Sequence, residues 1–361
     1  PPLSELPPLS EYPPLSEVPP HLWQGWQCAQ HIQYSAGNIA EYQQDVIVHR
    51  SEGTAYEEIV GGLKIWHIYV GNRCKSDYGD IRFLDGNNQD LSYYLWPDYT
   101  TSSARFTVKL ATAGTLKVVY GNPNASSTSN ADSTFIFFDD CEAGSPDQKW
   151  IAVSALGSFA YVSDVRQTGL QSLKLVSGSY EDAFGSKIQA PSSPYRVDAY
   201  VYYPTSSDTS NKVMTRVSSV GTSDYQGYGV RPTYMLEGQQ FQIHKRSGGK
   251  WTVLYSGPAQ GSVGTWAKLS IIVDRSNITV YHNDTYITTI TDATISSGAI
   301  IGARCTTGSM FMDNIAARAY TSTPPSFQSA TEVVIPALKP SATKTYSGDI
   351  QRIAVAEQGD W

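Results

Sequence analysis

The carboxylate, histidine and nucleophile patterns that support catalysis are missing from this sequence. Glycoside hydrolases built on β-strands place carboxylates at alternate positions of one strand, and no E-x-D-x-E segment occurs. The H-E-x-x-H, G-x-S-x-G, P-loop and G-x-G-x-x-G motifs are also absent. The histidines have no metal-ligand spacing: His21, His31, His49, His67, His244 and His282. We therefore predict that the chain is not an enzyme.

Aromatic residues in a glycine-rich segment offer a different chemistry, the binding of sugars. The segment YQGYGVRPTY (225–234) precedes a predicted hairpin. The C–H faces of sugars stack on aromatic rings, while polar side chains bond the hydroxyl groups. We predict glycan contacts from six residues of this region: Tyr225, Tyr228, Arg231, Tyr234, His244 and Trp251. The alternative is that the tyrosines cover sheet faces inside the protein.

The composition favours β-structure throughout the chain. Of 361 residues only 16% are charged and 12% are aromatic, with 24 Tyr, 29 Gly and 20 Pro. This profile is typical of strands joined by Gly, Pro, Asn and Ser turns. The net charge of −7 argues against a nucleic-acid partner, which normally requires a basic patch. No apolar run approaches the roughly 18 residues of a membrane span, so we predict none.

The N-terminus is a repeat of six residues: PPLSEL, PPLSEY, PPLSEV and a broken copy, PPHLWQ. Paired prolines favour polyproline II, which has three residues per turn. Six apolar side chains then form one stripe: Leu3, Leu6, Leu9, Tyr12, Leu15 and Val18. We predict that this stripe docks on another copy of the chain; the alternative is a stiff spacer.

Two blocks of strand-like segments follow the repeat. Short alternating or apolar segments recur every 8–12 residues, and SerGlyGly (247–249) and Asn283-Asp284 have the composition of hairpin turns. This spacing predicts a β-sandwich or jelly roll. We assign four parts to the chain: a proline-rich repeat (1–22), a β-sandwich (23–138), a jelly roll (139–320) and a linker with an extended β tail (321–361). The strand TEVVIPAL (331–338) is predicted to add to the sheet edge of a neighbour; the alternative is that the tail packs back on its own chain.

Several segments of the first block resemble one family. DYGDIRFLDG (77–86), YYLWPDY (93–99), KVVYGNPNASSTSNAD (117–132) and FFDDCEAG (137–144) are together similar to domain of unknown function 2341, a β-sandwich of archaeal and bacterial surface proteins. Members are usually followed by a concanavalin A-like (laminin G-like) jelly roll, which the second block resembles. The resemblance implies an extracellular or surface module without an assigned reaction. Cys141 stands where the family usually has phenylalanine.

Four acidic residues are candidates for a structural calcium site. Asp139, Asp140 and Glu142 precede the first jelly-roll strand, and Asp313 lies in the last, which runs beside the first in such folds. Hard oxygen ligands suit Ca²⁺, and the position resembles the structural calcium site of many carbohydrate-binding jelly rolls. The alternative is that these acids cap turns.

The four cysteines permit one disulfide in each domain. The simplest pairing for an exported protein is Cys28–Cys74 and Cys141–Cys305, although three pairings exist and four buried thiols are an alternative. Three sequons predict N-glycosylation at Asn124, Asn277 and Asn283.

Together these features predict a non-catalytic, self-assembling surface protein that binds glycan. We expect it outside the cell, on the cell surface or on the surface of a virion. The alternatives are a filament, sheath or virion-fibre subunit without sugar binding, and a secreted glycoside hydrolase. A soluble lectin has no use for an apolar polyproline stripe, which favours assembly with other copies of the chain.

Overall fold

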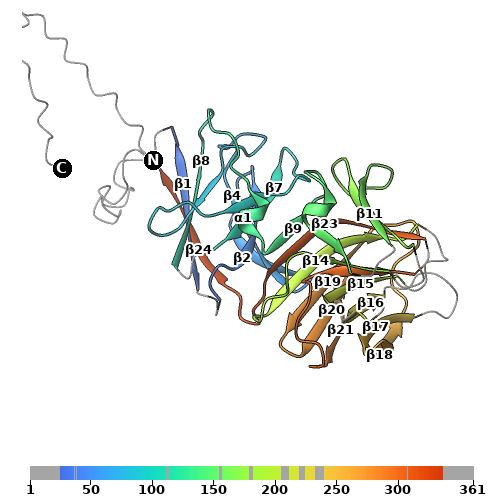
Figure 1. The fold of residues 1–361 in the computed structure, drawn as a ribbon. Coiled ribbons are helices and arrows are strands. Elements are labelled where there is room, and N and C mark those ends of the chain that lie inside the picture. The colour runs from blue at the N-terminus through green and yellow to red at the C-terminus, as the bar shows by residue number, and fades with distance from the viewer. Residues whose placement is uncertain are drawn as a thin grey trace, which may run out of the picture.

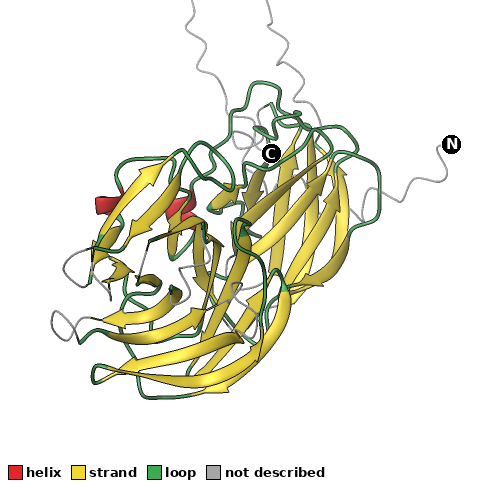
Figure 2. Cartoon of the chain, turned by 90° about the vertical axis from the view of Figure 1, so that its right-hand side faces the viewer, coloured by secondary structure: helices red, strands yellow, loops and turns green. Residues whose placement is uncertain are grey.

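The chain folds as β-sheet almost throughout. The computed structural model describes residues 25–35, 37, 39–110, 114–153, 157–178, 182–204, 211–218, 224–231, 240–306 and 308–335. Helical structure within these residues is confined to α1 (Ala131–Thr134) and a single 3₁₀ turn, η5 (Pro146–Gln148), as Figure 2 shows. The predicted all-β class, with a β-sandwich followed by a jelly roll, is confirmed (Figure 1). None of the described helices is long and apolar enough to cross a membrane.

The first sandwich contains a four-stranded and a five-stranded sheet around one core. The four-stranded sheet has the order β24 (Ser326–Val334), β1 (Cys28–Ser35), β8 (Gly114–Tyr120) and β5 (Arg82–Leu84). The five-stranded sheet has the order β3 (Tyr56–Val60), β4 (Leu63–Tyr69), β2 (Gln43–His49), β7 (Ser103–Lys109) and β6 (Tyr93–Leu95). Inward-facing side chains such as Ile32, Trp66 and Phe106 are fully buried between them. Alternation along each strand directs these apolar residues to one face.

The jelly roll contains a seven-stranded and an eight-stranded sheet. The seven-stranded sheet has the order β10 (Trp150–Ala152), β13 (Asp182–Ser186), β22 (Gly302–Cys305), β15 (Lys212–Ser218), β16 (Gln226–Arg231), β17 (Gln240–Ser247) and β18 (Lys250–Pro258). The other has the order β11 (Ser158–Val162), β12 (Ser172–Val176), β23 (Ser309–Ala319), β14 (Tyr195–Tyr202), β19 (Ala267–Asp274), β20 (Asn277–His282) and β21 (Thr285–Thr291), with β9 (Phe137–Asp139) paired to β23. The main core lies between the two sheets.

Two hairpin turns form where the sequence predicts them. Gly248 and Gly249 join β17 to β18 with φ values of 57° and 72°. Asn283 and Asp284 join β20 to β21 with φ values of 46° and 62°. Two consecutive residues with positive φ are the requirement of a type I′ turn, and Gly, Asn and Asp adopt it at the lowest steric cost.

The last described strand corrects one prediction. Residues 331–334, the start of TEVVIPAL, lie in β24, which pairs antiparallel with β1 of the same chain from Cys28↔Val334 to Ser35↔Ser326. Figure 1 shows this strand beside β1, at the edge of the first sandwich. Phe327 and Ala330 pack against the core of the first sandwich, which explains why the strand returns to its own chain. For these residues the alternative holds: the tail packs back on its own chain instead of pairing with a neighbour's sheet.

Candidate functional site

One face of the seven-stranded sheet is turned away from the main core. On β16, Tyr228 and Val230 point into that core, so Gly227 and Gly229 lie on the opposite face. The absence of a side chain at Gly229 makes room for the side chain of Lys212 from β15, because a Cβ added at Gly229 would lie 2.8 Å from Lys212 Cδ. We call the polar and aromatic side chains that gather on this side the Trp251 face: Lys212, Arg231, Gln242, His244, Arg246, Trp251 and Arg304.

Three cationic side chains surround the indole of Trp251. Lys212 Nζ lies 4.6 Å from the ring centroid, and the guanidinium carbons of Arg304 and Arg246 lie 5.0 and 5.7 Å from it. They come from β15, β22 and β17, so three strands converge on one ring. The Gly248-Gly249 turn places Trp251 directly opposite Arg246. These cation–π contacts hold the indole against the sheet.

Hydrogen bonds fix the polar side chains beside the tryptophan. Arg231 Nη2 donates to Gln242 Oε1, which also lies 3.1 Å from His244 Nε2. Gln242 Nε2 donates to Ser256 Oγ on β18 at 3.1 Å. Burial, followed by the charges of nearby cations, lowers the pKa of His244 to about 3. Its imidazole is therefore neutral at physiological pH and acts as a fixed hydrogen-bonding group.

The structure brings together only part of the predicted glycan site. Arg231, His244 and Trp251 lie on the Trp251 face, and Tyr234 lies outside the described residues. The rings of Tyr225 and Tyr228 are 0% and 1% exposed, so the prediction that they present a stacking surface is wrong. Tyr228 packs in the main core. Tyr225 packs on the other side of the sheet, under the guanidinium of Arg246 at 4.4 Å.

Four members of the Trp251 face are not among the predicted glycan contacts. They are Lys212, Gln242, Arg246 and Arg304, which come from three different strands, and their proximity depends on strand register. A signal was nevertheless present in β16, where glycine occupies alternate positions 227 and 229. Glycines at alternate positions of a strand mark a place where other groups approach the backbone closely.

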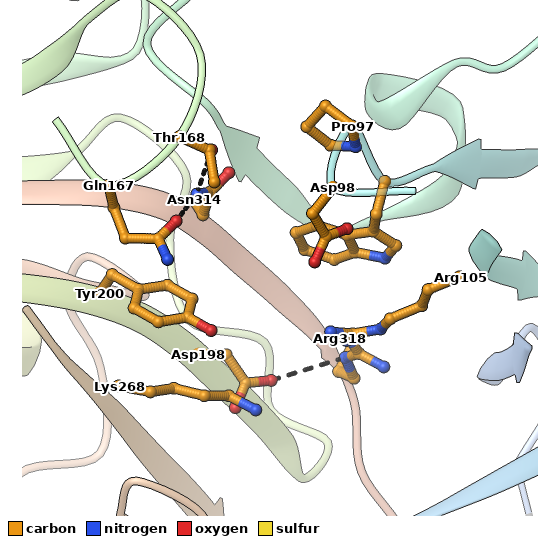
Figure 3. A pocket seen from close by; sticks show the side chains of 11 residues that line it. Pro97, Asp98, Arg105, Gln167, Thr168, Asp198, Tyr200, Lys268, Asn314 and Arg318 are labelled. Carbon is orange, nitrogen blue, oxygen red and sulfur yellow. Dashed lines mark hydrogen bonds and ion pairs between the residues drawn. The ribbon is translucent and has the colours of Figure 1, made fainter. Parts of the chain in front are cut away.

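A second, smaller site lies between the two sandwiches (Figure 3). The pocket has a volume of about 40 Å³, which holds a few water molecules and is too small for a sugar ring. The Arg105 guanidinium lies 4.5 Å from the ring centroid of Trp96 at one side. The residues that line the pocket are Trp96, Pro97, Asp98, Arg105, Gln167, Thr168, Asp198, Tyr200, Lys268, Asn314 and Arg318.

Buried charges beside this pocket join the sandwiches. Asp45 of β2 accepts hydrogen bonds from Arg105 Nη2 at 2.9 Å, Thr107 Oγ1 at 2.5 Å and Arg318 Nη1 at 3.0 Å. Burial alone would raise the pKa of Asp45, but the two arginines outweigh it and lower the value to about 2. Arg318 belongs to β23 of the jelly roll, and its Nε lies 3.7 Å from Asp198 Oδ2 (Figure 3). The network therefore fastens one sandwich to the other.

The oxygens of the acidic residues predicted to hold calcium accept hydrogen bonds from the protein. Asp139 accepts from Trp150 Nε1 at 2.6 Å and Tyr161 Oη at 2.9 Å. Asp313 is fully buried and accepts from the backbone N–H groups of Gln167 and Asn314 at 2.9 and 2.7 Å.

The other two acids are more open. Glu142 Oε1 accepts from two backbone N–H groups, of Leu170 and Gln171, and Asp140 accepts from Tyr94 Oη at 3.3 Å. Among the described residues no group of three or more His, Cys, Asp or Glu side chains is arranged to hold a metal ion. Calcium at Asp139, Asp140, Glu142 and Asp313 stays a prediction.

The predicted disulfides are absent from the structure, and that prediction is wrong. All four are buried thiols, and neither Cys28–Cys74 nor Cys141–Cys305 is bonded. Cys141 Sγ lies 3.8 Å from the carbonyl oxygen of Met312, whereas Cys305 Sγ lies 3.8 Å from that of Leu175. Each sulfur thus contacts a different strand of the core. The sequon residues Asn124, Asn277 and Asn283 are exposed, and their glycosylation stays a prediction.

One family model matches part of the chain. Residues 77–153 match the family model described as "Domain of unknown function (DUF2341)". The matched segment begins before β5 and ends after β10, so it includes parts of both sandwiches. The resemblance to this family is confirmed for these residues. No curated protein matches the chain.

Several solved structures are similar to part of this chain. They include the carbohydrate-binding module CBM66 from Bacillus subtilis, with 14% identity, 47% of this chain and 95% of that chain covered, and a TM-score of 0.39. A protein of unknown function with a galectin-like fold, also from Bacillus subtilis, has 12% identity, 51% and 96% coverage, and a TM-score of 0.36. The exoplasmic/lumenal domain of VIP36 in its Ca²⁺/Man3GlcNAc-bound form has 15% identity, 46% and 84% coverage, and a TM-score of 0.34.

Proposed function

We propose that this chain is a non-catalytic surface protein that binds glycan through the Trp251 face of its jelly roll. The observation that carries the proposal is the half-buried indole of Trp251 beside Arg231, Gln242 and His244. A sugar presents a C–H face to an aromatic ring and hydroxyl groups to polar side chains, and this face offers both. We place the protein outside the cell or on a cell or virion surface, where glycans are abundant.

The accessible part of the face lies along β16, β17 and β18. Val253 is 51% exposed, and Ser256 is also exposed. Trp251, Arg231 and Gln242 are half-buried, so each keeps part of its side chain at the surface. Because the hairpin, the hydrogen bonds and the cation–π contacts already hold these side chains, binding costs little side-chain entropy.

The described carboxyl groups with raised pKa values do not favour a hydrolase. A glycosidase needs a carboxylic acid with a raised pKa within reach of the substrate. Burial raises the pKa of Asp139 and Asp313, but both are at most 1% exposed and bonded to protein donors. These two acids therefore lack access to a glycosidic bond, which supports the non-catalytic proposal.

The test is affinity electrophoresis of the protein through gels that contain soluble polysaccharides, with Trp251→Ala as the variant. Trp266→Ala is the matched control, because Trp266 is also half-buried but packs against Tyr202 of the other sheet. We expect retardation by at least one polysaccharide, lost in Trp251→Ala and kept in Trp266→Ala. Equal retardation of both variants, or none of the native protein, would contradict the proposal.

A second function, self-association through the tails, rests on where the tails begin. The backbone N–H of Ile335 donates to the carbonyl oxygen of Gln27 at 2.8 Å, and Val334 pairs with Cys28. The segments before residue 25 and after residue 335 therefore start from the same end of the four-stranded sheet. The predicted docking stripe, Leu3 to Val18, lies outside the described residues. Two tails that start together could contact a second copy jointly, which gives avidity.

A further inference from the structure

The eight-stranded sheet of the jelly roll ends in a long strand that has neither charge nor proline. β21, with the sequence TYITTIT, pairs with β20 on one side, and no described strand pairs with its other side. Natural proteins protect such edges from pairing with another chain by short length, charged side chains, proline or a bulge. An edge without charge or proline is a candidate surface for the addition of a strand.

The other described sheet edges are short or carry charge. β3 contains two glutamates, β18 begins with lysine and ends with proline, and β24 contains a glutamate. β5, β6 and β10 have three residues each, and β11 has five. With seven residues, β21 is the longest described edge that has neither a charge nor a proline.

A bulge limits the regular part of β21 to its second half. The register with β20 shifts at Ile287, which has no opposite residue. A bulge twists an edge and interrupts its pairing, so the first half of the strand is protected. From Thr288 to Thr291 the pairing with β20 is regular. This segment is the part of the edge that can accept another strand.

The backbone of this segment directs two threonines toward the free edge. The N–H of Asp292 donates to the carbonyl oxygen of Ser276 at 2.8 Å, so these two residues form a hydrogen-bonded pair of the β20–β21 ladder. In an antiparallel ladder such pairs alternate with pairs whose N–H and C=O groups point away from each other. The N–H and C=O groups of Thr289 and Thr291 therefore point away from β20, toward the side that no described strand occupies.

Charges next to this edge are neutralised within the chain. Asp284, just before β21, lies 2.8 Å from Lys268 Nζ, and Asp292, just after it, lies 2.6 Å from Lys245 Nζ. The adjacent β20 contains no Asp, Glu, Lys or Arg. Two copies of a chain with a net charge of −7 repel one another. An electrically neutral edge is where they can approach with the least repulsion.

We infer that β21 pairs with β21 of a second copy, antiparallel and around a two-fold axis at Ile290. Thr289 of each copy then lies opposite Thr291 of the other, and each of these two pairs exchanges two backbone hydrogen bonds. The two Ile290 side chains meet at the axis, beside the jelly-roll core on which each already packs. Two eight-stranded sheets become one continuous sheet. Because a single strand pair is a small interface, the dimer is weak and depends on concentration.

A cysteine at the axis tests this geometry in the full chain. Residues that face each other in a non-hydrogen-bonded pair have Cα atoms about 4.5 Å apart, a separation that a disulfide can bridge. Under mild oxidation we expect Ile290→Cys to form a dimer on a non-reducing gel, with a yield that rises with protein concentration. The four native cysteines are buried thiols and should contribute little.

Tyr286→Cys is the matched control for this cross-link. Tyr286 is 56% exposed and lies on the same strand. Its Cα would lie roughly 25 Å from that of the same residue in the second copy, because the two strands run in opposite directions from the axis. We expect little dimer from Tyr286→Cys, and thermal unfolding should show that both variants fold. Equal yields from the two variants, or no dimer from a folded Ile290→Cys protein, would overturn the inference.

A charge on the edge provides the second test, again read from the cross-link so that contacts through the tails do not affect the result. Thr289→Lys and Thr285→Lys are each combined with Ile290→Cys; both threonines are exposed, and only Thr289 belongs to the pairing segment. We expect Thr289→Lys to lower the dimer yield several-fold and Thr285→Lys to change it little. The host should add no N-glycans, because Asn277 and Asn283 flank this edge. Equal yields from the two folded lysine variants would contradict pairing through Thr289.

Discussion

Arg318 and Asp45 form an ion pair across the two sandwiches, with Arg318 Nη1 lying 3.0 Å from Asp45 Oδ1 although the residues are 273 positions apart. Both side chains are 1% exposed. A buried hydrogen bond also joins the sandwiches: Arg196 Nη1 of the jelly roll donates to the carbonyl oxygen of Gly61 in the β3–β4 turn at 2.5 Å. Buried polar contacts with good geometry fix orientation, so the sandwiches are held in one arrangement rather than joined by a flexible linker.

Removing the charge of Asp45 should strongly destabilise the protein. Asp45→Asn leaves Arg105 and Arg318 without their shared carboxylate, and breaking a buried pair typically costs about 3–5 kcal/mol. We expect a clear fall in the melting temperature measured by circular dichroism. Asp132→Asn is the control, because Asp132 is 79% exposed and should change the melting temperature little. A native melting temperature for Asp45→Asn would show that the pair does not stabilise the fold.

The same carboxylate predicts a loss of stability in acid. The pKa of Asp45 is about 2 in the folded chain, against its ordinary value of 3.8. The unfolded chain therefore binds the proton first, and stability falls as the pH drops from about 4 to about 2. Unfolding by urea at several pH values should show this slope in the native protein and a smaller one in Asp45→Asn. Identical slopes would assign the acid sensitivity to other groups.

The cysteines should behave as protected thiols. Burial raises the pKa of Cys74 to about 11 and that of Cys141 well above its ordinary value, so little thiolate is present at neutral pH. We expect negligible alkylation by iodoacetamide in the native state and four alkylated cysteines after denaturation without reductant. Mass spectrometry distinguishes these states. If two cysteines resisted alkylation in denaturant and became reactive after dithiothreitol was added, the protein would contain a disulfide and this prediction would be wrong.

If calcium binds near Asp313, its effect on stability should depend on pH in a way that general ionic effects do not. Burial raises the pKa of Asp313 to about 6, so a cation competes with a proton there. If Asp139, Asp140, Glu142 and Asp313 hold Ca²⁺, added calcium raises the melting temperature above pH 6 and has less effect near pH 5. Asp140→Asn should remove the response. The same melting temperature in EDTA and in calcium at neutral pH would contradict the calcium prediction. The four acids would then serve as hydrogen-bond acceptors only.

Deletion of residues 1–20 tests assembly through the proline-rich stripe. We expect the full chain to form oligomers or filaments in light scattering and electron microscopy, and the shortened chain to form smaller particles. All of the described strands are retained, because β1 begins at Cys28. Deletion of residues 340–361, which also lie beyond the described strands, is the control for the loss of a tail as such. An unchanged particle size after deletion of residues 1–20 would show that the repeat is not needed for assembly and would favour the spacer alternative.

The strand pattern and the turns could be predicted from the sequence, because both depend on residues close together in the chain. Alternating apolar positions and frequent turn residues predicted an all-β protein, and the Gly248-Gly249 and Asn283-Asp284 turns formed as expected because these residues tolerate positive φ. Trp251 and His244 were also assigned correctly to one region, since a tight hairpin brings β17 and β18 together.

Contacts between distant segments were decided only by the tertiary structure. The pairing of β24 with β1, the burial of Tyr225 and Tyr228, and the absence of the predicted disulfides all depend on which strands become neighbours. Lys212 and Arg304 are adjacent in the sheet although 92 positions separate them in the chain. Residues so far apart meet because sheet register and the stacking of two sheets bring their strands together, and no local preference of the chain specifies that choice.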